Sequence, residues 1–196
     1  MNEVPHDIQL DREDIILMVI EANERLHGRA FLSGITRLEK LVYLLEQETD
    51  FEGVGHFFPF FAHNFGPFSK EVYEAVDFLA GCNLLEVREK SYGSLYASAG
   101  EAGLAEAIAD DEAVEVEVEV ESNIKEKEFK LTDDGRTVAR KMRDAVAHKR
   151  PSDVAQLDTI VHKYGAWPLR QIIRYVYRRY PTMTANSIHP EAKRLR

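Results

Sequence analysis

Two helix starts separated by a hairpin pattern are the features that most constrain how this chain can fold. Ala62–Tyr73 (AHNFGPFSKEVY) places a Gly-Pro pair just before Ser69, a residue type that favours helix N-termini. Further along, Leu131–Arg136 (LTDDGR) ends a strand pattern and begins another helix. A helix, a β-hairpin and a second helix start, in this order, are typical of a winged helix. This layout predicts a binding module.

The spacing of apolar residues predicts a mostly helical α+β chain. Helical periodicity recurs in six segments, and most of them begin at a residue type that caps helices. Thr36 and Glu39 form a capping-box pattern, while Thr132 and Ser152 are expected to cap later helices. The expected helices span 11–27, 37–48, 70–80, 133–148, 153–164 and 168–179.

Extended segments are expected at 57–63, 84–87, 92–97, 114–121 and 125–131. Pro59 favours an edge position for the first of them, and Gly66–Pro67 is expected to turn the chain. Val114–Glu121 alternates valine with glutamate, which places all the valines on one strand face and all the carboxylates on the other. We expect this strand to pair with Lys125–Leu131 in a hairpin around Asn123. Its carboxylates lie in a line, so they do not converge on a metal.

Composition favours a cytoplasmic protein. The 196 residues are 44% hydrophobic, which is enough for a core, yet no run of eighteen apolar residues predicts a membrane span. The polar, acidic stretch Met1–Arg12 lacks the features of a secretory signal. Cys82 is the single cysteine, so no internal disulfide can form. It lies in an apolar helix pattern, and we interpret it as a small core residue.

Charge is distributed unevenly along this acidic protein. The net charge is −9, but residues 136–196 hold 14 basic and 4 acidic residues, and the rest hold 11 basic and 30 acidic ones. Such asymmetry suggests that the basic part has an anionic partner. That partner could be nucleic acid, or it could be the acidic part of the same chain or of a second copy.

A family resemblance rests on short motifs. The stretch from Ile35 to Leu45 (ITRLEKLVYLL), followed by Phe61-Ala62, Phe65-Gly-Pro67 and Val72-Tyr73, resembles the SocA-like (Panacea) antitoxin-domain superfamily. The chain is also similar to YwgA-like proteins of bacteria and archaea. The late motif of that group stands here as Tyr164-Gly165, Leu169, Tyr175-Val-Tyr177 and Tyr180-Pro181. The resemblance implies a mostly helical winged-helix-like fold and an antitoxin, adaptor or regulator role. The acidic insertion near 98–121 departs from the family pattern.

We therefore predict a winged-helix-like domain over 1–150 and a basic two-helix extension over 151–196 that packs on it. The first functional hypothesis is a DNA-binding transcriptional regulator. The helix after the Gly-Pro turn carries three acidic residues, Glu71, Glu74 and Asp77. Their negative charge disfavours inserting that helix into a phosphate-lined groove. The basic helices after Thr132 are therefore the better candidate surface for binding nucleic acid. The candidate nucleic-acid contacts are Lys70, Tyr73, Arg88, Lys90, Arg136, Arg140, Lys141, Arg170, Arg174 and Arg178.

The alternative hypothesis is a protein-interaction module, such as an antitoxin or adaptor that binds a toxin, a defence-system component or a second copy. The aromatic segment 57–68 and the last helix could supply anchors for a partner, or they could be ordinary core. Polar groups also meet a tight turn and many aromatics near Gly66–Pro67, and could line a pocket. The candidate pocket or partner-binding residues are His63, Asn64, Phe65, Phe68 and Tyr175.

Catalytic motifs are missing from the sequence. None of the seven histidines has a metal-ligand spacing such as His-Glu-x-x-His. There is no Gly-rich phosphate loop, nucleophile elbow or paired-acid motif. We therefore predict a non-enzymatic protein with no catalytic residues, no cofactor, no metal and no membrane partner.

Overall fold

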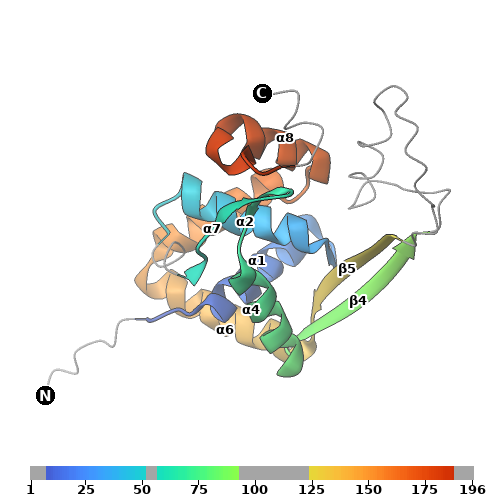
Figure 1. Cartoon of the computed structure of the whole chain (residues 1–196). Helices are drawn as coiled ribbons and strands as arrows, with labels where there is room; N and C mark the ends of the chain where they lie inside the picture. The colour runs from blue at the N-terminus through green and yellow to red at the C-terminus, as the bar shows by residue number, and fades with distance from the viewer. Residues whose placement is uncertain (1–7, 52–56, 93–123, 188–196) are drawn as a thin grey trace, which may run out of the picture.

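The computed structural model describes residues 8–51, 57–92 and 124–187 of the chain. Helices make up most of it, and a long β-hairpin projects from them (Figure 1). The chain is therefore mostly helical α+β, as predicted. None of the helices within the described ranges is both long and apolar enough to cross a membrane. In order, the elements are α1 (Arg12–His27), β1 (Leu32–Ser33), α2 (Ile35–Glu48), β2 (Phe61–His63), β3 (Gly66–Phe68), α4 (Lys70–Gly81), β4 (Leu85–Tyr92), β5 (Ile124–Leu131), α6 (Asp133–Lys149), α7 (Pro151–Tyr164), α8 (Leu169–Arg179) and the 3-10 helix η1 (Pro181–Thr184).

The core is built around α1. Every residue from Ile15 to Asn23 is buried, which is the pattern of a helix covered on all sides. Helices α4, α6 and α7 cover it, and α7 and α8 also pack against α2. The two C-terminal helices thus share the hydrophobic core with the helices that precede them.

A reciprocal capping box starts α1. The Asp14 N–H donates to the Asp11 carboxylate at 3.0 Å, and the Asp11 N–H donates to the Asp14 carboxylate at 3.0 Å. The pKa of Asp14 is raised to about 6, mainly because burial disfavours the charged form; the hydrogen bond from Asp11 opposes this shift, and the charges of Asp11 and Glu13 add to it. Asp14 is therefore a local source of pH-dependent stability.

We expect Asp14→Asn to raise the melting temperature at pH about 7.5 relative to the native chain, with the difference shrinking towards pH 4. The folded-state pKa of about 6 exceeds the ordinary value of 3.8, so between these two pH values the folded chain binds more protons than the unfolded chain. The contribution of Asp14 to stability therefore falls as pH rises through the window. An amide oxygen at residue 14 can still accept the Asp11 N–H.

Thermal unfolding followed by circular dichroism at several pH values measures this effect. The control is Asp134→Asn in the first turn of α6, where the helix dipole favours the charge and no gain is expected. A native chain that is more stable than Asp14→Asn at pH about 7.5 would contradict the expectation.

The three-stranded sheet has the order β1-β5-β4, and all its pairs are antiparallel. Strand β5 pairs with β4 along its whole length, from Leu85↔Leu131 to Tyr92↔Ile124, and β1 adds two residues on its other edge. The expected strand 125–131 is confirmed, but its long partner is β4 and not the valine–glutamate segment. That segment, the insertion near 98–121 and most of the expected strand 92–97 lie outside the described residues.

Thr132 ties the start of α6 to the start of β4. Its hydroxyl accepts the Gly135 N–H at 2.9 Å and donates to the Asn83 carbonyl at 2.8 Å. Its own N–H donates to the Leu84 carbonyl at 3.2 Å. The predicted cap is therefore confirmed, and the same residue also joins two elements that are distant in sequence.

Three of the predicted local signals were wrong. Helix α2 begins at Ile35 without a side-chain cap, and Thr36 is buried in its first turn. Ser152 lies inside α7, which begins at Pro151. Cys82 follows the last turn of α4 and is exposed, because the apolar face of α4 ends at Leu79.

The β2–β3 hairpin also differs from the prediction. The strand is confined to 61–63, and Gly66 and Pro67 belong to β3, so the two-residue turn is Asn64–Phe65. Ser69 precedes α4 as predicted, but its hydroxyl donates to the Glu71 carboxylate at 2.7 Å and caps no backbone N–H.

Residues after α8 fold back on this hairpin. Asn186 donates to the Ala62 carbonyl at 3.1 Å, and the Ser187 hydroxyl donates to the Asn64 carbonyl at 2.9 Å. The Ser187 and Tyr177 hydroxyls are 2.7 Å apart. The hairpin is thereby fixed against the C-terminal helices.

Candidate functional site

A cluster of four rings lies on the β2–β3 hairpin and the first turn of α4. We call Phe61, His63, Phe68 and Tyr73 the aromatic face. Ring centroids are 5.3 Å apart for Phe61 and Phe68, 4.8 Å for His63 and Phe68, and 5.4 Å for Phe68 and Tyr73. Phe61 is 50% exposed, whereas Phe58 in the same aromatic run is fully buried. The run therefore contributes both to the core and to the surface.

The hairpin is held from both of its outer edges. Ala62 and Pro67 are paired across the hairpin. The Ala62 carbonyl accepts from the Asn186 side chain, and the Pro67 carbonyl accepts from the Lys40 ammonium at 2.7 Å. Proline is tolerated at an outward-facing strand position because no ladder N–H is required there. Gly66 has a φ of +92°, and a Cβ on it would lie 2.7 Å from Cε1 of Tyr177. The close approach of the hairpin to α8 thus requires glycine at residue 66.

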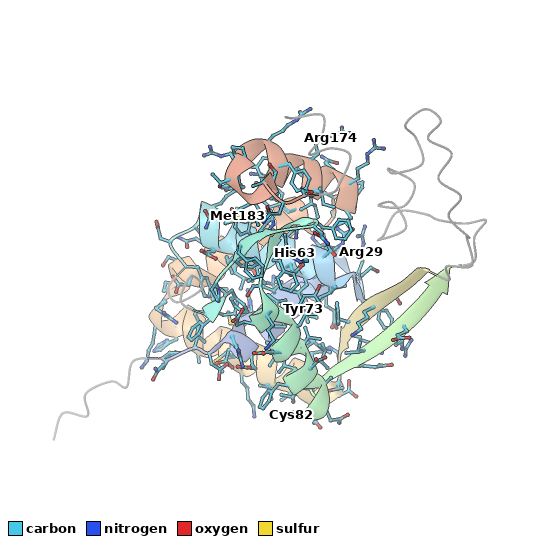
Figure 2. The ribbon with its side chains drawn as sticks, in the orientation of Figure 1. Arg29, His63, Tyr73, Cys82, Arg174 and Met183 are labelled. Atoms are coloured by element: carbon cyan, nitrogen blue, oxygen red, sulfur yellow. The ribbon has the colours of Figure 1, made fainter. Side chains whose placement is uncertain are left out.

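A cavity of about 200 Å³ lies under the aromatic face, between the hairpin, α2 and α4. Three rings of the face, His63, Phe68 and Tyr73, also line the cavity. Its other lining residues are Thr36, Glu39, Lys40, Asn64, Phe65, Gly66 and Pro67. Figure 2 shows His63 on the hairpin and Tyr73 on the adjoining part of α4.

A buried ion pair contributes to this cavity. Lys40 is 1% exposed and Glu39 is 3% exposed, and the Lys40 Nζ lies 3.7 Å from the Glu39 Oε2. The Glu39 Oε1 accepts the Ser69 N–H at 3.3 Å. Burial lowers the pKa of Lys40, and the Glu39 carboxylate opposes that shift. The two charges are therefore held away from water by α2 and the hairpin.

The structure brings four of the five candidate pocket residues together. His63, Asn64, Phe65 and Phe68 all line the cavity. Sequence analysis missed Glu39 and Lys40, because adjacent charged residues in an amphipathic helix give no signal of burial. The spacing of Thr36 and Glu39 predicts a capping box, whereas the Glu39 carboxylate accepts the backbone N–H of Ser69, just before α4.

Tyr175 lies elsewhere, in a cluster around Glu48. The Tyr164 and Tyr175 hydroxyls each donate to the Glu48 carboxylate at 2.6 Å, and the Tyr180 hydroxyl does so at 3.5 Å. The Lys163 Nζ lies 3.7 Å from the same carboxylate. Tyr175 therefore connects α8 to the end of α2 and does not touch the cavity.

The candidate nucleic-acid contacts on α4 carry little free positive charge. The Lys70 ammonium lies 2.7 Å from the Glu74 carboxylate, one turn away on the same helix. Tyr73 belongs to the aromatic face, where its ring contacts Phe68. Asp77 is exposed. Helix α4 therefore presents aromatic and acidic groups more than cationic ones.

One candidate contact on β4, Arg88, lies near an aromatic side chain and an acid. Arg88 forms an ion pair with Glu86, and its guanidinium lies 4.8 Å from the ring centroid of Phe31. Lys90 is paired in register with Glu126 on β5. The Arg88 cation is thus partly balanced inside the hairpin.

On α6, one candidate arginine is bound within the chain. Arg136 donates to both oxygens of Glu24 at 2.7 and 3.3 Å, and to Asp133 at 2.8 Å. Arg140 and Lys141 are exposed. The acidic part of the chain therefore forms ion pairs with at least one of the candidate basic residues.

On α8, Arg170, Arg174 and Arg178 are spaced four residues apart, so they share one helix face. Figure 1 shows α8 and α6 on opposite sides of the helical body, with α1, α2 and α7 between them. Figure 2 shows Arg174 at the end of the molecule that α8 forms. The structure therefore separates the two groups of candidate basic residues.

Within the described ranges, no group of three or more His, Cys, Asp or Glu side chains is arranged to hold a metal ion. Comparison of the chain with family models, with curated proteins and with solved structures finds no match.

Proposed function

We propose that the chain up to the end of α6 forms a winged-helix-like scaffold. The order α1, β1, α2, α4, β4, β5, with β5 between β1 and β4 in one antiparallel sheet, supports this proposal. On this proposal α4 takes the position of the recognition helix and β4–β5 forms the wing. The β2–β3 hairpin is then an addition between the second and third helices, and α7 and α8 form the C-terminal extension.

We infer that the protein is a non-enzymatic interaction module, antitoxin- or adaptor-like, that binds a protein partner at the aromatic face. The observation that carries this proposal is the contiguous ring cluster on the hairpin, with Phe61 half exposed. Clustered exposed aromatics mark interaction sites, since their burial supplies much of the binding energy. The acidic groups of α4 next to this face favour a partner with a basic rim.

DNA binding is the weaker proposal. It was the first hypothesis from the sequence, but Lys70, Arg88 and Arg136 are each ion-paired with acids of the same chain. Pairing with phosphate would require breaking or sharing those contacts. The candidate basic residues of α6 and those of α8 also lie on opposite sides of the molecule.

The aromatic face is tested by Phe61→Ala, with Phe78→Ala as the matched control. Phe78 is 58% exposed on α4 and does not belong to the ring cluster. We expect Phe61→Ala to weaken partner binding at least about tenfold and Phe78→Ala to leave it nearly unchanged. The partner is first identified in an extract of the source cells as a protein that the native chain captures and the Phe61→Ala variant does not. The purified pair is then measured by calorimetry, at low salt and at high salt.

Aromatic contacts should persist at high salt, whereas binding to duplex DNA should fall steeply. A salt-sensitive complex with DNA that survives Phe61→Ala would instead support the DNA-binding proposal. Self-association that requires Phe61 would identify a second copy as the partner. Equal binding by both phenylalanine variants would reject the aromatic face as the interface.

A further inference from the structure

We propose that the aromatic face recognises an arginine of the partner, whose guanidinium stacks on the exposed rings and pairs with the carboxylates of α4. This inference rests on the proposed function, because it names the side chain that the partner presents. It follows from the geometry and exposure of the rings, from the charge beside them, and from an arrangement of the same kind elsewhere in this chain.

The rings of the aromatic face are arranged to receive a cation. The Phe61 ring stands at 86° to the His63 ring and at 65° to the Phe68 ring, so the three rings form a corner of non-parallel planes. Phe61 and His63 are exposed, and Phe68 is half-buried. The face of an aromatic ring attracts a cation that lies within about 6 Å of its centroid. Exposed rings at these angles therefore offer a platform for a cationic side chain.

Helix α4 adds negative charge that the chain does not balance. The Glu74 carboxylate lies 2.7 Å from the Lys70 ammonium and 3.1 Å from the Arg12 guanidinium. Among the described residues, neither Glu71 nor Asp77 forms an ion pair. Two carboxylates of α4 are therefore left to interact with a ligand cation.

These two carboxylates lie beside the aromatic face. The Glu71 carboxylate accepts the hydroxyl of Ser69 at 2.7 Å, and Ser69 directly follows Phe68. Asp77 is exposed four residues after Tyr73, so the two side chains share one face of α4. The rings of Phe68 and Tyr73 thus have a carboxylate on either side along the chain.

The chain holds one of its own arginines by a ring and a carboxylate. The guanidinium of Arg88 lies 4.8 Å from the centroid of the Phe31 ring and forms an ion pair with Glu86. In contrast, none of the described Lys and Arg side chains lies over the ring of Phe61 or Phe68. The aromatic face has the rings and the carboxylates of such a site, and the partner supplies the guanidinium.

Arginine fits this surface better than lysine or an apolar anchor. A guanidinium is planar and weakly hydrated, so it can stack on a ring while its N–H edge donates to a carboxylate. A lysine ammonium is a compact, strongly hydrated point charge and loses more hydration when it contacts a ring. An apolar anchor would leave the carboxylates of Glu71 and Asp77 beside it without a counter-charge.

Three capped peptides of sequence Gly-Ser-Xaa-Gly-Ser, with arginine, lysine or citrulline as Xaa, test this inference on the intact chain. Citrulline keeps the length and planarity of arginine but is uncharged. Each peptide is titrated into ¹⁵N-labelled protein at pH about 8, above the range in which histidines ordinarily titrate, and amide shifts of the hairpin and α4 are followed by NMR. We expect the arginine peptide to bind at least about fivefold more tightly than either of the others.

Equal affinity for the arginine and citrulline peptides, or for the arginine and lysine peptides, would overturn the inference. Absence of shifts at the hairpin with the arginine peptide would do the same.

Phe61→Leu and Asp77→Asn supply a second readout, and both change exposed residues. Leucine keeps most of the apolar area but has no ring, so we expect Phe61→Leu to abolish the preference for arginine over citrulline. Asp77→Asn should weaken binding of the arginine peptide about twofold or more. The matched controls Phe78→Leu and Asp134→Asn should leave that binding unchanged. A preference that survives Phe61→Leu, or an Asp77→Asn variant that binds like Asp134→Asn, would overturn the inference.

The outcomes separate this inference from the proposed function. Partner binding that Phe61→Ala abolishes, in a chain without preference among the peptides, would keep the interface and reject the arginine. A preference for the arginine peptide, together with partner binding that is unaffected by Phe61→Ala, would keep arginine recognition and reject the aromatic face as the partner interface.

Discussion

Gly135→Ala is expected to lower the free energy of unfolding by about 3 kcal/mol or more. A Cβ on Gly135 would lie 1.9 Å from the carbonyl oxygen of Leu84 and 2.8 Å from its carbonyl carbon. Both are backbone atoms, so no side chain can move aside to relieve the clash. The start of α6 would have to separate from β4, which would break the hydrogen bonds of Thr132 to Asn83 and Leu84.

Denaturant unfolding of Gly135→Ala, followed by circular dichroism, measures this loss. Asp134→Ala is the matched control, because it introduces the same side chain at an exposed position in the same turn. It should cost no more than about 1 kcal/mol, from the lost interaction with the helix dipole. If Gly135→Ala were no more harmful than this control, the close contact between α6 and Leu84 would be contradicted.

The Leu-Thr-x-x-Gly segment illustrates what local sequence can predict. Thr132 caps α6 because the cap is made within four residues, and the helix start was therefore predictable. The reason for glycine at residue 135 was not predictable, because the atom that excludes a Cβ belongs to Leu84. Local signals thus located the element, while the contact that makes the motif specific comes from tertiary packing.

The hairpin and its cavity show the same limit. The aromatic run predicted an extended segment whose rings could be core or surface. Which ring is buried is decided by tertiary packing, and the structure buries Phe58 and exposes Phe61. Thr36 and Glu39 have the spacing of a capping box, yet Glu39 bonds to the backbone before α4. That hydrogen bond joins residues 30 apart in the sequence, and no local pattern could indicate it.

Lys40→Met is expected to cost about 3 kcal/mol or more of unfolding free energy. Methionine approximates the length of lysine, so packing is largely kept. The substitution removes the 2.7 Å hydrogen bond to the Pro67 carbonyl and the ammonium 3.7 Å from the Glu39 carboxylate. A buried carboxylate without its counter-charge is the larger of the two losses, since Glu39 is only 3% exposed.

The double variant Lys40→Met with Glu39→Gln separates the charge effect from the packing effect. It leaves no unpaired charge, and its amide oxygen can still accept the Ser69 N–H. We therefore expect it to be more stable than Lys40→Met alone by about 1–2 kcal/mol. Denaturant unfolding of the native chain, both single variants and the double variant completes the cycle. Simple additivity of the two single losses would show that Lys40 and Glu39 do not stabilise each other.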